Sequence, residues 1–298
     1  MKLIIGSEGK GIWGQKVIRQ LIKKIYKEID IEFINDSSCD LIIKSVFIHN
    51  EKIWNTDFKK YIYWSGESYM PDESEYQTKK LYISTTINNI DTNNNIYLPY
   101  VLFSSHLYKG RLFVNNERKY LLAYCNSHKV KEREDFYNLF IEKTSDTLCH
   151  AYGKCCGKYK NTQQSKAEGN WCDINLINIY KDYKFVIAME NKCLDGYVTE
   201  KIVNAFYSGA IPIYWGSSNI NDFFNKNAFI NVNDYDSFDD CINYILTMDE
   251  LSIIQMQSEP IYNTENEIIN LLNNDYNLKN ENKTLKSYLE KLNLFLTD

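Results

Sequence analysis

The stretch Lys184–Gly216 constrains the fold more than any other part of this 298-residue chain. Its apolar run Phe185–Met189 does not alternate with polar residues, which is typical of a strand covered on both faces. A polar loop follows, then a predicted helix from about Thr199 that stops at Gly209, and then a second strand at Ile211–Trp215. This order predicts a βαβ unit of a parallel sheet, and such sheets bind ligands at the carboxyl ends of their strands.

Lys201 stands in the first turn of this predicted helix, where the helix dipole disfavours a positive charge. A bound anion would remove the mismatch, because backbone N–H groups and the ammonium would converge on a phosphate. The alternative is that Lys201 points to solvent beside Glu200, at a cost of roughly a few tenths of a kcal/mol. The spacing alone leaves both interpretations open.

The chain begins with the same alternation of strands and helices. Residues 2–5 read as a strand, the glycine-rich segment Gly9–Gly14 follows, and a helix and a second strand lead to Asp36. This pattern fits the fingerprint GxGxxG with an acidic residue about 20 positions on, which binds dinucleotides. One hypothesis is therefore a nicotinamide- or flavin-dependent enzyme. The other is a tight turn in a Rossmann-like domain that binds a different ligand.

Two further strand ends carry candidate functional residues. A predicted strand from Tyr61 runs into Glu67, which is suited to a general base, although a solvated loop residue is the simpler alternative. The predicted strand Tyr120–Tyr124 is followed by a loop and by a helix containing Arg133. Arg133 and Lys201, at one edge of one sheet, would clamp a diphosphate, unless they are unrelated surface charges.

Metal chemistry has weaker signals. Asp234-Tyr-Asp236 has the DxD form of metal-dependent sugar transferases, but acidic residues also stabilise the start of a helix, expected here from about Ser237. We favour this structural interpretation. The eight cysteines include no CxxC pair and have only His150 nearby, so we expect reduced cysteines and no metal site.

The remaining segments complete a two-domain prediction. Ile96–Phe103 and Ala228–Val232 read as strands and residues 150–172 as a polar loop. An amphipathic helix from about Glu281 is expected to fold back on the body. The predicted division is 1–118, 119–276 and 277–298, the last being this helix.

Composition sets limits on partners. The net charge of −5 gives no reason to expect nucleic-acid binding. No apolar run is long enough for a signal peptide or a transmembrane segment, so neither is expected.

Several of these segments together resemble the α-1,3/4-fucosyltransferase family. The resemblance spans about Lys60 to Asp240. Its centre is Glu190-Asn191, Tyr197-Val-Thr-Glu-Lys201 and Ile211-Pro-Ile-Tyr-Trp-Gly216; further motifs are Ser65-Gly-Glu67 with Pro71, Arg133-Glu-Asp-Phe-Tyr137 and Tyr152-Gly-Lys-Cys155.

The resemblance implies an α/β fold of the GT-B type, in which two Rossmann-like domains face a cleft. The N-terminal domain would bind the acceptor and the next domain the donor. The implied reaction is inverting transfer of L-fucose from GDP-fucose to a hydroxyl of a glycan acceptor, with an α-1,3 linkage expected, in glycan biosynthesis or protein glycosylation. No tightly bound cofactor and no obligatory metal are implied.

Seven residues receive roles through the resemblance. The chemistry would belong to Glu67, which deprotonates the acceptor, and to Arg133 and Lys201, which stabilise the departing GDP. The donor contacts would be made by Glu200 to hydroxyls of ribose or fucose, by Tyr197 in the nucleotide pocket, and by Glu190 and Asn191 on the fucose side.

The sequence departs from the family in three places. Secreted members carry a membrane anchor and disulfides, whose absence leads us to expect a cytoplasmic enzyme. Lys192 and Leu194–Gly196 differ from many members, and Met189 stands where many have Phe. Three alternatives remain: another GDP-deoxyhexose donor, an NAD-linked oxidoreductase using Gly9–Gly14 and Asp36, and a glycan-binding module without activity.

Overall fold

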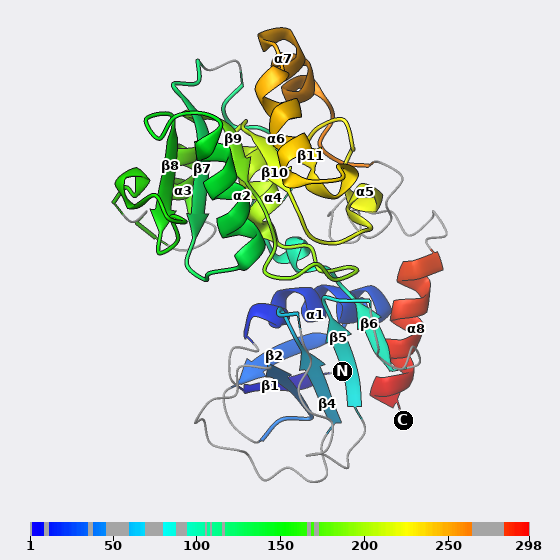
Figure 1. The fold of residues 1–298 in the computed structure, drawn as a ribbon. Helices are drawn as coiled ribbons and strands as arrows, with labels where there is room; N and C mark the ends of the chain where they lie inside the picture. The colour runs from blue at the N-terminus through cyan, green and yellow to red at the C-terminus, as the bar shows by residue number, and fades with distance from the viewer. Residues whose placement is uncertain are drawn as a thin grey trace. The chain divides into compact units, whose positions relative to one another are not determined.

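The computed structural model contains two compact units, Met1–Phe103 with Thr264–Asp298, and Ser104–Asn263, each described by itself (Figure 1). Within them, the structure describes residues 2–8, 12–34, 38–45, 60–68, 80–87, 94–104, 106–107, 109–114, 117–165, 168–169, 173–263 and 283–297.

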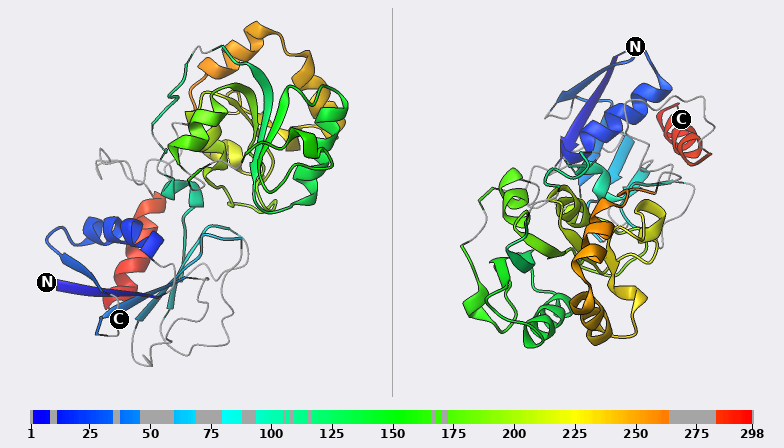
Figure 2. Two further views of the ribbon diagram at one scale, coloured as in Figure 1. Left: turned by 90° about the vertical axis from the view of Figure 1, so that its left-hand side faces the viewer. Right: turned by 90° about the horizontal axis from the view of Figure 1, so that it is seen from above.

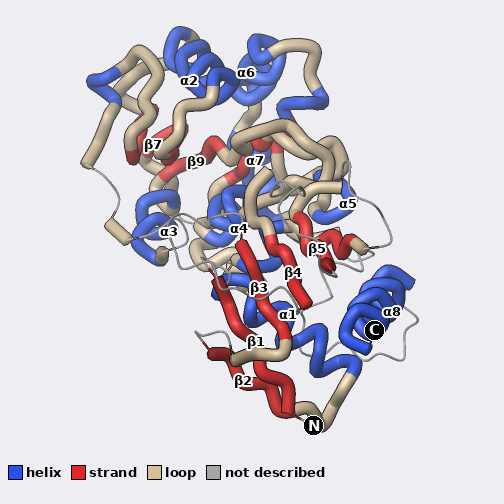
Figure 3. The backbone as a smooth tube through the Cα atoms, turned by 90° about the horizontal axis from the view of Figure 1, so that it is seen from below, coloured by secondary structure: helices blue, strands red, loops and turns tan. Residues whose placement is uncertain are grey.

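The first unit is built on a sheet of six strands in the order β2-β1-β3-β4-β5-β6, and every neighbouring pair is parallel. Figure 3 shows the strands β1 to β5 of this sheet in red. The strands are β1 (Lys2–Glu8), β2 (Asp30–Ile34), β3 (Leu41–Ser45), β4 (Lys60–Trp64), β5 (Lys80–Ser84) and β6 (Asn95–Tyr97). Ile42, Ile62 and Ile83 are buried in adjacent strands, as expected for a parallel sheet with both faces covered.

Two helices of this unit, α1 (Ile12–Ile25) and α8 (Lys283–Thr297), lie side by side although they come from opposite ends of the chain (Figure 2). Tyr26 Oη donates to Asn293 Oδ1 at 2.5 Å, and Lys60 Nζ donates to the carbonyl oxygen of Leu296 at 2.7 Å. The amphipathic helix therefore buries its apolar side in the first unit, through Tyr288, Leu292 and Phe295.

The glycine-rich start has the predicted β1-α1-β2 order of a Rossmann-like unit. Gly9–Gly11 and Asp36 lie outside the described residues, so the dinucleotide hypothesis stays a hypothesis. The predicted strand Ile96–Phe103 is wrong in its second half, where Tyr100–Phe103 form a 3-10 helix. Pro99 has no N–H to donate and breaks the strand at this point.

The second unit contains a parallel sheet of five strands in the order β11-β10-β9-β7-β8. Its strands are β7 (Tyr120–Asn126), β8 (Cys149–Gly153), β9 (Tyr183–Ile187), β10 (Ile211–Tyr214) and β11 (Ile230–Asn231). The sheet includes β8 where a polar loop was predicted over residues 150–172. Its edge position explains the miss, because the short segment needs few apolar residues.

Helices cover both faces of this sheet (Figure 1). Side chains of α2 (Lys131–Glu142), α6 (Phe238–Thr247) and α7 (Glu250–Ser258) form the core on one face. On the other face, α3 (Ile174–Tyr180) and α4 (Glu200–Tyr207) pack against Ala123 and Val186 of the strands. The short helix α5 (Ile220–Phe223) follows β10. Large buried aromatic and aliphatic side chains on both faces hold the strands in place.

The predicted βαβ unit of Lys184–Gly216 is confirmed as β9, α4 and β10, with parallel pairing of β9 and β10. Thr199 occupies the N-cap position of α4. After the helix, Gly209 has a φ of +77°, and a Cβ atom there would lie 1.9 Å from the carbonyl oxygen of Phe113. Glycine is therefore required where the helix stops.

Two boundaries differ from the prediction. The second unit begins at Ser104 instead of residue 119, because the segment before β7 binds to this unit. Leu112 N donates to the carbonyl oxygen of Tyr207 at 2.7 Å, and Arg118 Nη1 donates to that of Ser208 at 3.1 Å. The strand predicted at residues 228–232 shortens to the two residues of β11.

The described cysteines are free thiols. Among the described helices, none combines the length and the apolar character that crossing a membrane requires.

Candidate active site

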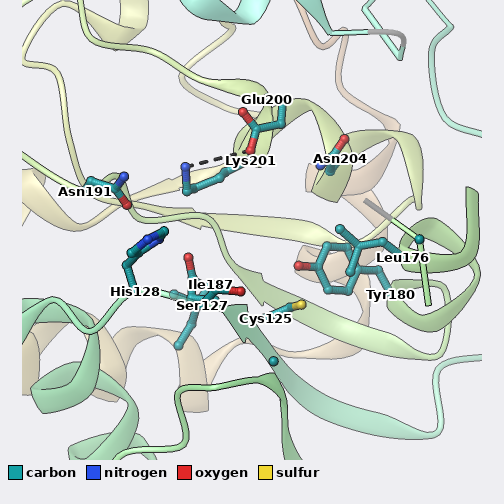
Figure 4. Close-up of a pocket in the computed structure, with 13 residues that line it drawn as sticks. Cys125, Ser127, His128, Leu176, Tyr180, Ile187, Asn191, Glu200, Lys201 and Asn204 are labelled. Atoms are coloured by element: carbon teal, nitrogen blue, oxygen red, sulfur yellow. Dashed lines mark ion pairs between the residues drawn. The ribbon is translucent and has the colours of Figure 1, made fainter. Parts of the chain in front are cut away.

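A cavity of about 360 Å³ lies in the second unit at the carboxyl ends of β7 and β9 and at the start of α4 (Figure 4). This is the edge at which open parallel sheets bind ligands. Figure 4 shows Lys201, Asn191 and His128 gathered at one end and Tyr180 with Leu176 at the other. The lining residues are Cys125, Asn126, Ser127, His128, Gly153, Gly169, Leu176, Tyr180, Ile187, Asn191, Glu200, Lys201 and Asn204.

Glu190 is fully buried and holds the start of α4. Its Oε1 accepts from Thr199 N at 2.7 Å, and its Oε2 accepts from Thr199 Oγ1 at 2.8 Å. Gly216 allows this arrangement, since a Cβ atom there would lie 2.7 Å from Glu190 Cγ. A larger residue at position 216 would therefore clash with the side chain of Glu190.

Lys201 faces the cavity with its ammonium between two carboxylates. Its Nζ lies 3.3 Å from Glu190 Oε2 and 3.8 Å from Glu200 Oε1, and donates to Thr199 Oγ1 at 3.0 Å. An ammonium has three N–H donors, and strong charge-assisted bonds measure about 2.7–2.9 Å. Within the described part of the chain, Lys201 therefore has two partners within hydrogen-bond distance and one donor left for a ligand.

The electrostatics of this cluster reflect burial and mutual attraction. Burial raises the pKa of Glu190 above its ordinary value, against the opposing attraction of Lys201. Burial by itself would lower the pKa of Lys201, but attraction to Glu200 and Glu190 outweighs it, so the pKa is raised. Lys201 is therefore positively charged at neutral pH, which is the state that attracts a phosphate.

Arg133 is fully buried behind the cavity, and it is absent from the lining. Its Nη1 donates to Asn126 Oδ1 at 2.7 Å and to Asn191 Oδ1 at 3.1 Å, and Nη2 donates to the carbonyl oxygen of His128 at 2.7 Å. Its Nε–H has no partner among the residues described. The guanidinium thus ties together the two loops that supply one end of the cavity.

Tyr197 and Glu67 are not among the residues of this lining. Tyr197 is 2% exposed and belongs to the buried last part of the loop before α4. Glu67 follows β4 in the first unit and is half-buried, and Thr85 Oγ1 donates to its carbonyl oxygen at 2.9 Å. The roles given to both residues stay predictions. Of the seven candidate residues, the structure places three in the lining, Asn191, Glu200 and Lys201, with Glu190 and Arg133 in direct contact with them.

The neutral end of the cavity was not foreseen. Burial raises the pKa of the Cys125 thiol to about 11 and, most strongly, that of the Tyr180 hydroxyl, so both are uncharged at neutral pH. Asn126 and His128 were missed too, although they directly follow a predicted strand, where ligand-binding loops are expected. Tyr180 comes from α3, which no sequence signal indicated.

The described residues include no group of three or more His, Cys, Asp or Glu side chains placed to hold a metal ion. Asp234 and Asp236 precede α6, whose first turn is capped instead by Ser237, with Oγ accepting from Asp240 N at 3.1 Å. Asp234 Oδ1 accepts from Asn231 Nδ2 at 2.9 Å. The expectation that the DxD segment stabilises the helix start is therefore wrong for Asp234.

Known structures share this arrangement of two parallel sheets. An α1,3-fucosyltransferase structure with GDP matches with a TM-score of 0.66 and 19% identity, covering 100% of this chain and 91% of that chain. The β-glucosyltransferase that modifies DNA matches with a TM-score of 0.53 and 14% identity, covering 99% and 98%. The fold is that of a GT-B glycosyltransferase.

Sequence comparisons are more specific. Residues 114–253 match the model for glycosyltransferase family 10 (fucosyltransferase), C-terminal part. The α-(1,3)-fucosyltransferase FucT of Helicobacter pylori is 26% identical over 227 residues, which are 69% of this chain and 48% of that protein. The putative fucosyltransferase R654 of Acanthamoeba polyphaga mimivirus is 33% identical over 178 residues, 56% of this chain and 28% of that protein. The human 4-galactosyl-N-acetylglucosaminide 3-α-L-fucosyltransferase 9 is 32% identical over 120 residues, 40% of this chain and 30% of that protein.

The residues that match the glycosyltransferase family 10 model lie in the second unit, which holds the cavity. The chain spans less than half the length of these curated relatives.

Proposed function

We propose that this protein transfers L-fucose from GDP-fucose to a hydroxyl group of a glycan acceptor, with inversion at the anomeric carbon. The observation that carries the proposal is the position of Lys201, charged and with one N–H donor left, at the wall of a cavity at the strand ends. The family match supports fucose as the transferred sugar, and the similar α1,3-fucosyltransferase structures with GDP and with GDP-fucose support GDP as the carrier.

The diphosphate is assigned to the end of the cavity formed by Lys201, Asn191 and His128. Breaking the sugar–phosphate bond leaves negative charge on GDP, and a fixed cation in a partly desolvated site stabilises it. Arg133 adds its charge from behind Asn126 and Asn191, where burial limits screening by water. The nucleoside is assigned to the uncharged end with Tyr180 and Leu176.

In the proposed reaction, the acceptor oxygen attacks the anomeric carbon of fucose while the bond to GDP breaks. The acceptor proton passes to the carboxylate of Glu67, so that the products are the fucosylated glycan, GDP and a protonated base. Glu200 is assigned to hydroxyl groups of the ribose or the fucose. An α-1,3 linkage, a cytoplasmic location and a role in protein glycosylation stay predictions from the sequence.

Calorimetry of the full chain with GDP-fucose, GDP, UDP-glucose and NADH tests the donor. We expect binding of the two guanosine compounds only. Binding of NADH alone would favour the oxidoreductase hypothesis, and equal use of another GDP-deoxyhexose in a transfer assay would remove the specificity for fucose. A suitable first acceptor is a 4-galactosyl-N-acetylglucosaminide, which the name of the human relative contains.

The base has its own test. Glu67→Gln removes the proton acceptor and keeps the shape, so transfer should fall about 10²–10⁴-fold while GDP binds as before. Glu117→Gln, a change at an exposed residue of the second unit, serves as the control and should leave transfer unchanged. Full turnover by the Glu67 variant would show that another group takes the proton.

A further inference from the structure

A second cavity, of about 450 Å³, lies in the second unit beside the edge strand β11. None of its lining residues belongs to the first cavity. Its walls come from the segment between α5 and β11, from the turn that holds the DxD segment, and from α6 and α7. A volume in the range of roughly 300–1,000 Å³ is typical of small-molecule sites. The cavity is therefore large enough for a ligand of its own.

Two tyrosines form an aromatic wall of this cavity. The ring centroids of Tyr235 and Tyr244 lie 5.5 Å apart, with an angle of 40° between the planes. Tyr244 is 42% exposed, so its ring remains accessible to a ligand. Burial raises the pKa of the Tyr235 hydroxyl, which keeps it protonated and able to donate a hydrogen bond.

Polar side chains complete the lining, and two carboxylates among them are held in place. Asn231 Nδ2 donates to Asp234 Oδ1 at 2.9 Å, and Asn225 Nδ2 donates to Glu259 Oε2 at 3.1 Å. The amide group of Gln255 and the two tyrosine hydroxyls make no hydrogen bond with any residue that the structure describes. The cavity thus offers fixed acceptors together with donors that have no partner in the described protein.

The charge of the lining excludes several ligand classes. The lining contains two carboxylates, Asp234 and Glu259, and one cation, Lys226. Its net negative charge disfavours a phosphate or another anion. A metal ion has no group of three ligating side chains among the described residues. A purely apolar ligand would leave the polar groups without partners, which is costly.

A sugar ring fits what remains. Its C–H face is apolar and packs on an aromatic ring, while its hydroxyl groups both donate and accept hydrogen bonds. We propose that the cavity formed by Tyr235, Tyr244, Asp234, Gln255 and Glu259 binds a neutral oligosaccharide, at a site separate from the donor cavity. The C–H face of the sugar packs on the ring of Tyr244, and the carboxylates of Asp234 and Glu259 accept hydrogen bonds from the sugar's hydroxyl groups. This assignment does not rest on the proposed transfer reaction.

Saturation-transfer NMR on the full chain, with GDP present in excess, tests the proposal. The probes are neutral tetrasaccharides of the cello, malto and chito series and the disaccharide 4-galactosyl-N-acetylglucosamine. We expect at least one probe to bind in the millimolar range or tighter, and Tyr244→Ala to weaken it about tenfold. Ile254→Ala is the matched control, because Ile254 is 48% exposed on α7 and does not line the cavity. It should change the affinity less than twofold.

The proposal is overturned if no probe binds, or if Tyr244→Ala and Gln255→Ala both bind every probe as the wild type does. Gln255→Ala guards against a folding defect in the first variant, and the melting temperature of each variant is measured beside it. Calorimetry with GDP measures binding at the donor site separately. Absence of GDP binding to the wild type would therefore contradict the proposed function and leave this inference unaffected.

Discussion

The two strand-to-helix turns of the second unit, β7 to α2 and β9 to α4, look alike in sequence and differ in structure. Each has a cation near the start of its helix. Arg133 is fully buried and donates to the side chains and carbonyl groups of neighbouring loops. Lys201 is buried only in part, lies between Glu190 and Glu200, and keeps one donor. The first cation holds the site together, and the second faces the ligand.

Among the residues of these two turns, the largest effect on activity is expected for Lys201→Ala. The variant removes the cation that faces the diphosphate, so kcat should fall about 10²–10³-fold, as it does when a pre-organised donor is lost. Steady-state transfer kinetics measure this, with Lys201→Arg as the variant that keeps the charge. An unchanged kcat in Lys201→Ala would contradict the claim that Lys201, unlike Arg133, acts on the ligand directly.

The largest effect on stability is expected for Arg133→Ala. It leaves Asn126, Asn191 and the carbonyl oxygen of His128 without their donor in a buried place, and the free energy of unfolding should fall by about 3 kcal/mol or more. Urea denaturation measures the change. The control in the same helical turn is Lys131→Ala, whose side chain is 84% exposed, with an expected change within about 0.5 kcal/mol.

A pH series on Glu190→Gln sharpens the same comparison. The folded wild type binds a proton at Glu190 more readily than the unfolded chain does, because the pKa of this carboxyl is raised above 4.5. Linkage then requires its contribution to stability to be greatest below pH 4.5 and to decline as the pH rises through the raised pKa. Denaturation curves should show this decline in the wild type and its absence in the variant. A parallel pH dependence of both would contradict the electrostatic account of the β9–α4 turn.

The smallest effect is expected for His128→Ala. His128 lines the cavity from the loop that Arg133 holds and offers one hydrogen bond, so its loss should weaken GDP binding about two- to tenfold. Calorimetry measures this affinity, and His128→Gln, which keeps a donor, should recover part of it. Equal affinities in all three proteins would remove His128 from the site.

The sequence indicated the fold well where patterns are local. The apolar run from Phe185, the helix start at Thr199 and the stop at Gly209 each depend on neighbours within a few residues. Prediction failed at β8, a short edge strand, and after Tyr97, where Pro99 ends β6. These failures arise because one proline or one pairing partner outweighs a weak local preference.

The site was foreseen as a set of residues but not as a network. Position at a strand end predicted that Arg133 and Lys201 share one edge. Arg133 donates to Asn126 and Asn191, and both of these residues line the cavity with Lys201. The partners of Arg133 include Asn191, 58 residues away, and no local pattern indicates such a contact. The two cations differ in how deeply their side chains are buried. That depth depends on the packing of the whole unit, which no local sequence pattern encodes.

Calorimetric titration of GDP into the wild type and into Lys201→Ala tests the central claim most directly. The account predicts that the wild type binds GDP and that the variant, folded by its melting curve, binds at least about tenfold more weakly. Equal affinities, or no binding of GDP to the wild type at millimolar concentration, would contradict it.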